Sequence, residues 1–205
     1  MGEVPITRLI LSATLFLILT SCSLAPFSPN TSGQSYGAGK VKASVGNVNS
    51  TYHIKIGTGV SESMDIGFVM EFGAISTSAL FFKYSFMNNK TGLSNAFEFG
   101  YGSTDTTKFY YSGLISSLAF TESFELFLNP RINIVSTDSS DIELGDENGN
   151  IIINEYDVTY LQLTSGMNLW FSENVGMTLY AIYFAGNDIE TVQDTTTGFS
   201  FMFKY

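Results

Sequence analysis

Six charged residues occur at alternating positions within stretches that are otherwise apolar or small. They are Lys55, Glu71, Lys83, Glu98, Glu125 and Arg131. Acids and bases are both present, and an unpaired charge held away from water is costly. We therefore predict that these side chains form a network of ion pairs that fills an interior. The alternative for the same residues is a narrow pore with charged walls.

A second group of oxygen-bearing side chains lies in the acidic stretch 145–157, GDENGNIIINEYD. Asp146, Asn148, Asn150 and Asp157 have the spacing of ligand positions one, three, five and twelve of a calcium-binding loop. Ile151 stands where that loop needs glycine for its sharp turn, so we expect a hairpin turn at ENGN instead and predict no metal site. Calcium binding by these four residues remains the alternative interpretation.

Charge and motif content exclude several function classes. The net charge is −10, which argues against nucleic acid because binding phosphates needs clustered Lys and Arg. Ten of the 19 acids fall in segments 138–157 and 188–194, which we expect to attract cations or basic partners. No glycine-rich phosphate loop, Cys/His metal cluster or nucleophile elbow is present, so we predict no cofactor.

The N-terminus has the pattern of an export signal. Arg8 precedes an apolar run over residues 9–19, which is too short for a normal spanning helix. The sequence LTSC then ends at Cys22, the only cysteine, and resembles the bacterial lipobox in which that cysteine is lipidated. Cleavage after Ala25 is the alternative, which Pro26 disfavours. We predict a signal peptide over 1–21, a lipidated Cys22 followed by a flexible periplasmic linker to residue 36, and one domain over 37–205.

The elements that must position the charged residues are β-strands. From residue 37 onward, large apolar residues alternate with glycine, small polar residues and single charges, with a period of two. Charged residues are only 14% of the chain and aromatic residues 15%, so the large apolar faces must meet something other than water. An apolar outer face over a polar, crowded interior is the pattern of a transmembrane β-barrel. Closure of the barrel would leave no backbone group unpaired in lipid.

The strand count follows from the turns. We predict strands over 37–46, 51–60, 64–74, 78–88, 94–102, 107–120, 123–136, 156–171, 175–186 and 195–205. Short polar turns then follow the even-numbered strands, on the same side as both chain ends, as an even antiparallel barrel requires. The sequence therefore predicts an all-β, antiparallel up-and-down transmembrane barrel of about ten strands. Eight strands remain the alternative if two early segments do not span.

The C-terminal stretch carries a resemblance to a known family. Phe199, Phe201, Phe203 and Tyr205 alternate up to the last residue. With the export signal, the tight turns and the longer acidic loops, this resembles the small bacterial outer-membrane β-barrel proteins, over about residues 37–205. The resemblance implies that these four residues form the signal read by the outer-membrane assembly machinery. It also implies contact with outer-membrane lipid and location in the bacterial outer membrane.

These observations predict an integral outer-membrane protein with a structural or narrow-pore role, lipid-anchored at Cys22 and without enzymatic activity. One alternative is a soluble periplasmic β-barrel lipoprotein that binds an apolar ligand, with its aromatic residues inside. The other is an outer-membrane lipid-modifying enzyme, for which the only histidine, His53, would need a serine or aspartate partner. No serine lies two residues after His53, so we interpret it as filling the lumen beside Lys55.

Overall fold

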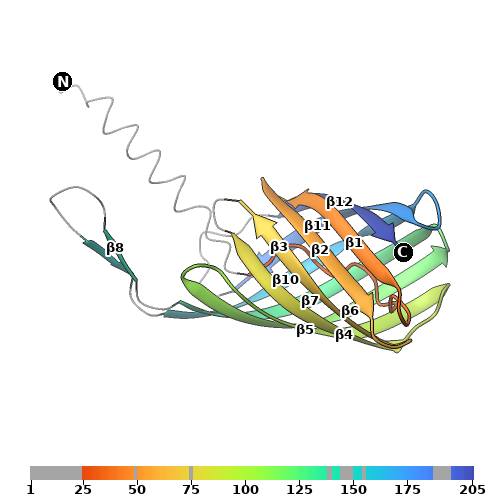
Figure 1. The fold of residues 1–205 in the computed structure, drawn as a ribbon, viewed down its shortest axis with the longest axis horizontal. Coiled ribbons are helices and arrows are strands. Elements are labelled where there is room, and N and C mark those ends of the chain that lie inside the picture. Colours follow the sequence, from red (N-terminus) through yellow and green to blue (C-terminus); the bar gives the residue numbers. More distant parts are fainter. Residues whose placement is uncertain are drawn as a thin grey trace, which may run out of the picture.

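The protein forms a closed antiparallel β-barrel of ten strands in a computed structural model (Figure 1). The structure describes residues 25–48, 50–73, 76–137, 140–143, 150–153, 156–186 and 195–205. Among these residues no helix is long and apolar enough to cross a membrane. The prediction of an all-β up-and-down barrel with about ten strands is confirmed, and the eight-strand alternative is wrong.

Each barrel strand pairs with its neighbour in the chain, apart from one insertion. The barrel strands are β1 (Val41–Val48), β2 (Thr51–Gly59), β3 (Met64–Phe72), β4 (Thr77–Met87), β5 (Gly92–Ser103), β6 (Thr107–Thr121), β7 (Phe124–Thr137), β10 (Tyr156–Trp170), β11 (Val175–Ala185) and β12 (Thr196–Lys204). The insertion between β7 and β10 is a separate hairpin of β8 (Ser140–Glu143) and β9 (Asn150–Ile153). β12 pairs with β1 and closes the barrel.

The barrel has two distinct ends. At one end the connections lie around residues 60–63, 88–91, 122–123 and 171–174, and we call this the short-turn end. The chain also finishes there, because Val41 and Tyr205 exchange two backbone hydrogen bonds of 2.9 Å. The opposite end carries the connections after β7 and after β11, and we call it the loop end. Short turns on one side and long loops on the other match the predicted arrangement.

The first strand begins later than predicted. We predicted it from residue 37, whereas β1 begins at Val41. Gly37 and Gly39 have φ angles of 88° and 74°, and the Lys40 amide donates to the Gly37 carbonyl at 3.1 Å. This turn redirects the chain into β1, because glycine adopts positive φ without steric cost.

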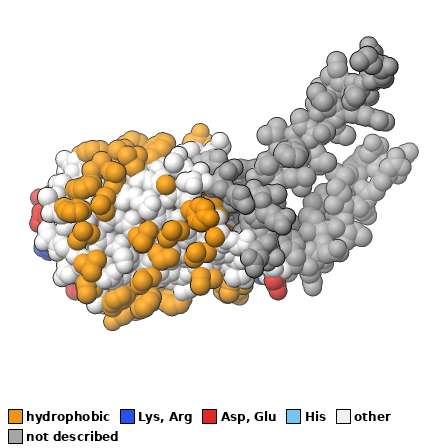
Figure 2. Space-filling view, turned by 180° about the vertical axis from the view of Figure 1, so that it is seen from behind, with side chains coloured by type: hydrophobic (Ala, Val, Ile, Leu, Met, Phe, Trp, Pro, Cys, Tyr) orange, Lys and Arg blue, Asp and Glu red, His pale blue; other side chains and the backbone are white. Residues whose placement is uncertain are grey.

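The outer face of the barrel is apolar between its two ends (Figure 2). Phe68, Leu80, Phe99, Ile132 and Leu179 are examples from five strands, each more than a third exposed. By alternation, the only charged side chains on the outward face of the ten barrel strands, as far as the structure describes them, are Lys108 and Asp157. Both lie at the loop end, next to Ser136 in the register. This surface fits lipid hydrocarbon rather than water.

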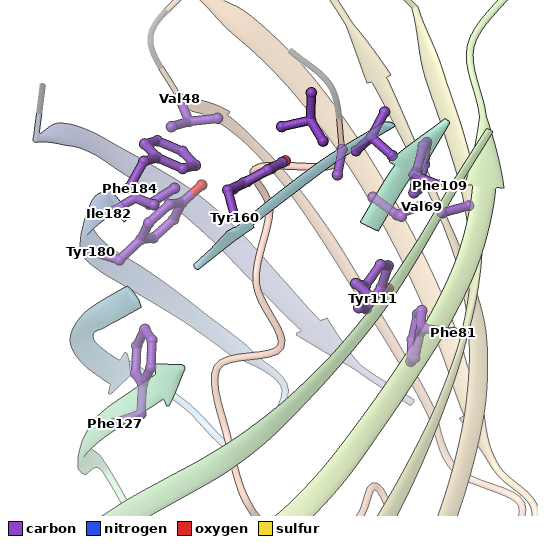
Figure 3. Close-up of a cluster of buried hydrophobic side chains, with 14 residues drawn as sticks. Val48, Val69, Phe81, Phe109, Tyr111, Phe127, Tyr160, Tyr180, Ile182 and Phe184 are labelled. Carbon is purple, nitrogen blue, oxygen red and sulfur yellow. The ribbon is translucent and has the colours of Figure 1, made fainter. Parts of the chain in front are cut away.

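The inner face is less uniformly polar than predicted. A cluster of apolar side chains fills the lumen toward the loop end, and Figure 3 shows it. It includes Phe109, Val135, Tyr160, Ile182 and Phe184, all buried. The alternation pattern does place these residues inward. From the sequence we nevertheless expect large apolar side chains on the outer face alone, and glycine, small polar residues and charges on the inner face. Most of this cluster lies in the half of the lumen near the loop end, where Glu71 is also found, whereas Asp65, Lys83 and Glu125 lie nearer the short-turn end.

Candidate functional site: a lumen occupied by residues 25–36

Residues 25–36 lie inside the barrel, and we call them the plug. Ala25 packs in the apolar cluster near the loop end, with Phe27 against it. Tyr36 lies toward the short-turn end, where its amide donates to Asp65 Oδ1 at 3.0 Å. The plug therefore runs along the lumen from the loop end to the short-turn end and then turns into β1. This corrects the prediction that residues 23–36 form a flexible periplasmic linker, as far as residues 25–36 are concerned.

Barrel side chains bind the plug mainly through its backbone carbonyls. Carbonyl oxygens along the plug accept hydrogen bonds as follows: Pro26 from Arg131 at 3.1 Å, Phe27 from Gln162 at 3.1 Å, Pro29 from Lys55 at 2.9 Å, Asn30 from Asn129 at 3.1 Å, Thr31 from Asn168 at 2.7 Å and Gln34 from Lys83 at 2.5 Å. Because an unpaired buried carbonyl costs free energy, these side chains replace the ladder partners that a strand would provide. The plug is held without being part of the sheet.

Acidic side chains of the lumen accept hydrogen bonds from the plug. The amides of Phe27 and Ser28 donate to Glu71 at 3.0 and 2.7 Å. The Ser32 hydroxyl donates to Glu125 at 2.7 Å. The carboxylates thus compensate the burial of plug donors, and hydrogen bonds to a charged acceptor are roughly twice as strong as neutral ones.

Two ion pairs lie between the barrel wall and the plug. Arg131 Nη2 is 3.0 Å from Glu98 Oε1, and Arg131 Nε donates to the same oxygen at 3.1 Å. Lys83 Nζ is 2.9 Å from Asp65 Oδ2. All four side chains are almost fully buried, so each charge depends on its partner.

Aromatic rings give the lumen cations a second partner. Lys55 Nζ lies 4.7 Å from the centre of the Phe81 ring, and the Arg131 guanidinium lies 4.2 Å from that of Tyr111. Lys83 Nζ lies 4.4 Å from the centre of the Tyr36 ring, which belongs to the plug. Cation–π contacts of this kind stabilise a desolvated charge.

The six charged residues that the sequence singled out all point into the lumen. Of these, the structure pairs Glu98 with Arg131, whereas Lys83 pairs with Asp65. The remaining three, Lys55, Glu71 and Glu125, bind the plug rather than a charged barrel residue. The interior is therefore arranged around a peptide segment that sequence reasoning had placed outside.

Little space remains beside the plug. The cavity next to His53 has a volume of about 20 Å³, enough for about one water molecule. His53 is buried there, with Lys55, Ser200 and Pro29 among the lining residues. No hydrogen bond to a serine or an acid is formed by its Nδ1 atom among the described residues.

The short-turn end opens into a larger hollow of about 550 Å³. Lys42 and Lys204, which face each other in the register of β1 and β12, both lie over the Trp170 ring, at 5.5 and 3.5 Å from its centre. Both lysines line this hollow, with Lys42 half-buried and Lys204 exposed at its mouth.

The remaining predicted residues fall partly outside the described chain. Cys22, Asp146 and Asn148 lie outside it, and the side chain of Asn150 is likewise not described. Residues 140–143 and 150–153 pair as a hairpin, as expected for this segment, and Asp157 is exposed on β10. In the described residues, no group of three or more His, Cys, Asp or Glu side chains is placed to hold a metal ion.

The C-terminal aromatic residues follow the outer wall of the barrel. Phe199 and Phe201 are exposed on the outer face, Phe203 is half-buried, and Tyr205 is exposed at the short-turn end. Ser200, between the first two, is buried inside. The stripe thus points away from the lumen, which favours the membrane barrel over a soluble binder with its aromatic residues inside.

Gly33 offers a test of how tightly the plug is held. A Cβ at this position would lie 2.5 Å from the backbone oxygen of Ser94 on β5, and backbone cannot yield as a side chain can. We expect Gly33→Ala to destabilise the barrel by about 1–3 kcal/mol, as overpacking does. Unfolding in detergent by urea measures this, with Gln34→Ala as the control because its side chain makes only a 3.5 Å contact at the mouth. Equal stability of both variants would mean that the plug is loosely held.

Comparisons with known proteins give slight likenesses. No protein-family model matches the chain, and no curated protein does. Among solved structures, a structure described as KdgM porin is similar at a TM-score of 0.46 and 9% identity, covering 81% of this chain and 99% of that one. The N-terminal β-barrel domain of Pseudomonas aeruginosa OprF is similar at a TM-score of 0.34 and 10% identity, covering 81% of this chain and 96% of that one. The outer-membrane enzyme PagL is similar at a TM-score of 0.37 and 13% identity, covering 80% of this chain and 97% of that one. These values are too low to transfer a function.

Sequence reasoning missed the plug. The signal that could have found it is composition: residues 25–36 hold no charged residue but many side chains with hydrogen-bonding groups. The same composition is typical of a solvated linker.

Proposed function

We propose that this chain is an integral protein of the bacterial outer membrane, whose barrel spans the membrane with its lumen closed by its own N-terminal segment. It has a structural role there and conducts no ions in its resting state. The observation that carries this proposal is the combination of an outer face that is apolar between the two ends of the barrel with a plug that runs through the lumen, where the cavity beside His53 holds only about 20 Å³ and the larger hollow lies at the short-turn end. Sidedness follows from the turns, since the short-turn end of such a barrel faces the periplasm.

Closure of the lumen by the plug is the feature that favours a structural role over a pore. The plug is hydrogen-bonded to β2, β3, β4, β5, β7 and β10, so its bonds reach most of the barrel wall. Removing it from this position would leave several buried charges without hydrogen-bond partners. A barrel of this size has little free interior once its side chains are placed, and the plug occupies that remainder.

Bilayer conductance tests the closed lumen. We expect purified wild-type protein in planar bilayers to show no steady channel openings, because a water-sized cavity cannot pass hydrated ions. Heat-modifiable migration on a gel, measured on the same sample, establishes that the barrel is folded. Large, steady openings from folded protein would overturn the structural role and support a pore.

The partners proposed for this protein follow from its two ends and its wall. The outer face takes lipid, and the stripe that ends at Tyr205 supports recognition by the outer-membrane assembly machinery. The acidic segments 138–157 and 188–194 belong to the loop end, where their charge favours cations or basic partners. We assign no catalytic role to His53, and its replacement by Ala is expected to leave assembly unchanged.

A further inference from the structure

We propose that the barrel carries the N-terminal side of its chain through the lumen to the outer face of the membrane, so that Cys22 is presented outside the cell and any lipid attached to it enters the outer leaflet. This rests on the proposed membrane location and sidedness. It reverses the expectation that the lipidated end begins in the periplasm.

The direction of the plug carries the proposal. Residues near its start bind the half of the barrel near the loop end: Phe27 lies edge-on to Phe184 at 5.6 Å between ring centres, and its amide donates to Glu71, next to the last residue of β3. Residues near its finish bind the other end: Ser35 donates to Asp65, the second residue of β3. Because β3 runs from the short-turn end to the loop end, the plug runs against it along the barrel axis.

The position of Ala25 fixes where the preceding residues can be. Ala25 belongs to the same buried cluster as Val48, Val135 and Val158, which lie close to the loop-end limits of β1, β7 and β10. Cys22 precedes it by three positions in the chain, and an extended chain covers at most about 3.3–3.6 Å per residue. Cys22 therefore lies within about 11 Å of Ala25 and cannot reach the short-turn end, since a strand of nine residues alone spans about 30 Å.

The chemistry of the lumen suits a passing chain. The barrel holds the plug largely by its carbonyl and amide groups, which every residue carries, through side chains such as Arg131, Lys55 and Asn168. These main-chain contacts hold the segment extended in the lumen, and side-chain contacts such as those of Asn30 with Glu98 and Ser32 with Glu125 fix its register.

An epitope inserted between Ser23 and Leu24 of the full chain tests the proposal. We expect antibody to bind this epitope on intact cells as strongly as it does after permeabilisation. The same epitope inserted at Asp105, in the loop-end turn between β5 and β6, is the control for outside. Insertion at Glu122, in the short turn between β6 and β7, is the control for the periplasm and should bind antibody only after permeabilisation.

Two further measurements keep the outcomes separate. If the insertion prevents folding, as heat-modifiability would reveal, Leu24→Cys replaces it, with labelling by a membrane-impermeant maleimide on intact and lysed cells. Palmitate labelling of wild type but not of Cys22→Ala reports lipidation independently of sidedness. Binding at Ser23–Leu24 or thiol labelling at position 24 only after permeabilisation would overturn the proposal, whereas failure of the Asp105 control to react from outside would overturn the proposed membrane location instead.

Discussion

Glu98→Gln is expected to lower the free energy of unfolding by about 3–5 kcal/mol, because it removes one partner of a buried ion pair and leaves the other charged. Glu98 accepts hydrogen bonds from Arg131, from Asn129 at 2.8 Å and from Asn30 of the plug at 2.7 Å. A glutamine has nearly the same shape but no charge to balance Arg131. Urea unfolding of the barrel in detergent measures the loss, with Glu62→Gln in an exposed turn as the matched control.

The double variant Glu98→Gln/Arg131→Met distinguishes the effect of the stranded Arg131 charge from the effect of altered packing. If the stranded charge causes the loss, removing Arg131 as well should recover much of it, since replacing a whole buried pair by apolar groups is often neutral. The plug would then lose the Arg131 bond to the Pro26 carbonyl, and Asn30 and Asn129 would share the single amide oxygen of Gln at position 98. A single variant as stable as wild type would contradict the buried pair and indicate a hydrated lumen.

Phe201→Lys is expected to block insertion into the outer membrane. Phe201 is exposed on the outer face, between Val45 of β1 and Met177 of β11 in the register. A lysine on the lipid face costs about 2–4 kcal/mol near the membrane midplane. Heat-modifiability and protection from added protease in cells measure assembly, and Phe201→Leu is the control that keeps the surface apolar.

A lysine at the neighbouring Ser200, on the lumen side of the same strand, is expected to act by a different mechanism. Alternation alone suggests that Ser200→Lys would be milder than Phe201→Lys, because Ser200 faces the lumen. The structure places Ser200 beside the cavity of about 20 Å³ that Lys42, Lys55 and Lys83 also line. A fourth lysine would have neither room nor a counter-charge, so we expect Ser200→Lys to be destabilising too, through the interior. Normal assembly of Phe201→Lys would contradict the outward direction of the stripe.

The sequence predicted those features that depend on local alternation. Strand positions, strand number and the inward direction of Arg131 and Glu98 follow from a period of two, which the pleat imposes on each strand. The start of β1 was misplaced because Gly37 and Gly39 adopt turn conformations that alternation does not reveal. The plug could not be predicted in this way, since its contacts are irregular and join residues far apart in the chain.

The plug also has a consequence for the order in which the protein folds. Phe27 binds Glu71, 44 residues further along, and Thr31 binds Asn168, 137 residues further along. Contacts between such distant residues form slowly, because a long loop must close before they stabilise anything. We therefore expect residues 25–36 to gain their full set of contacts only after β10 is in place, and the wall to close around them when β12 pairs with β1.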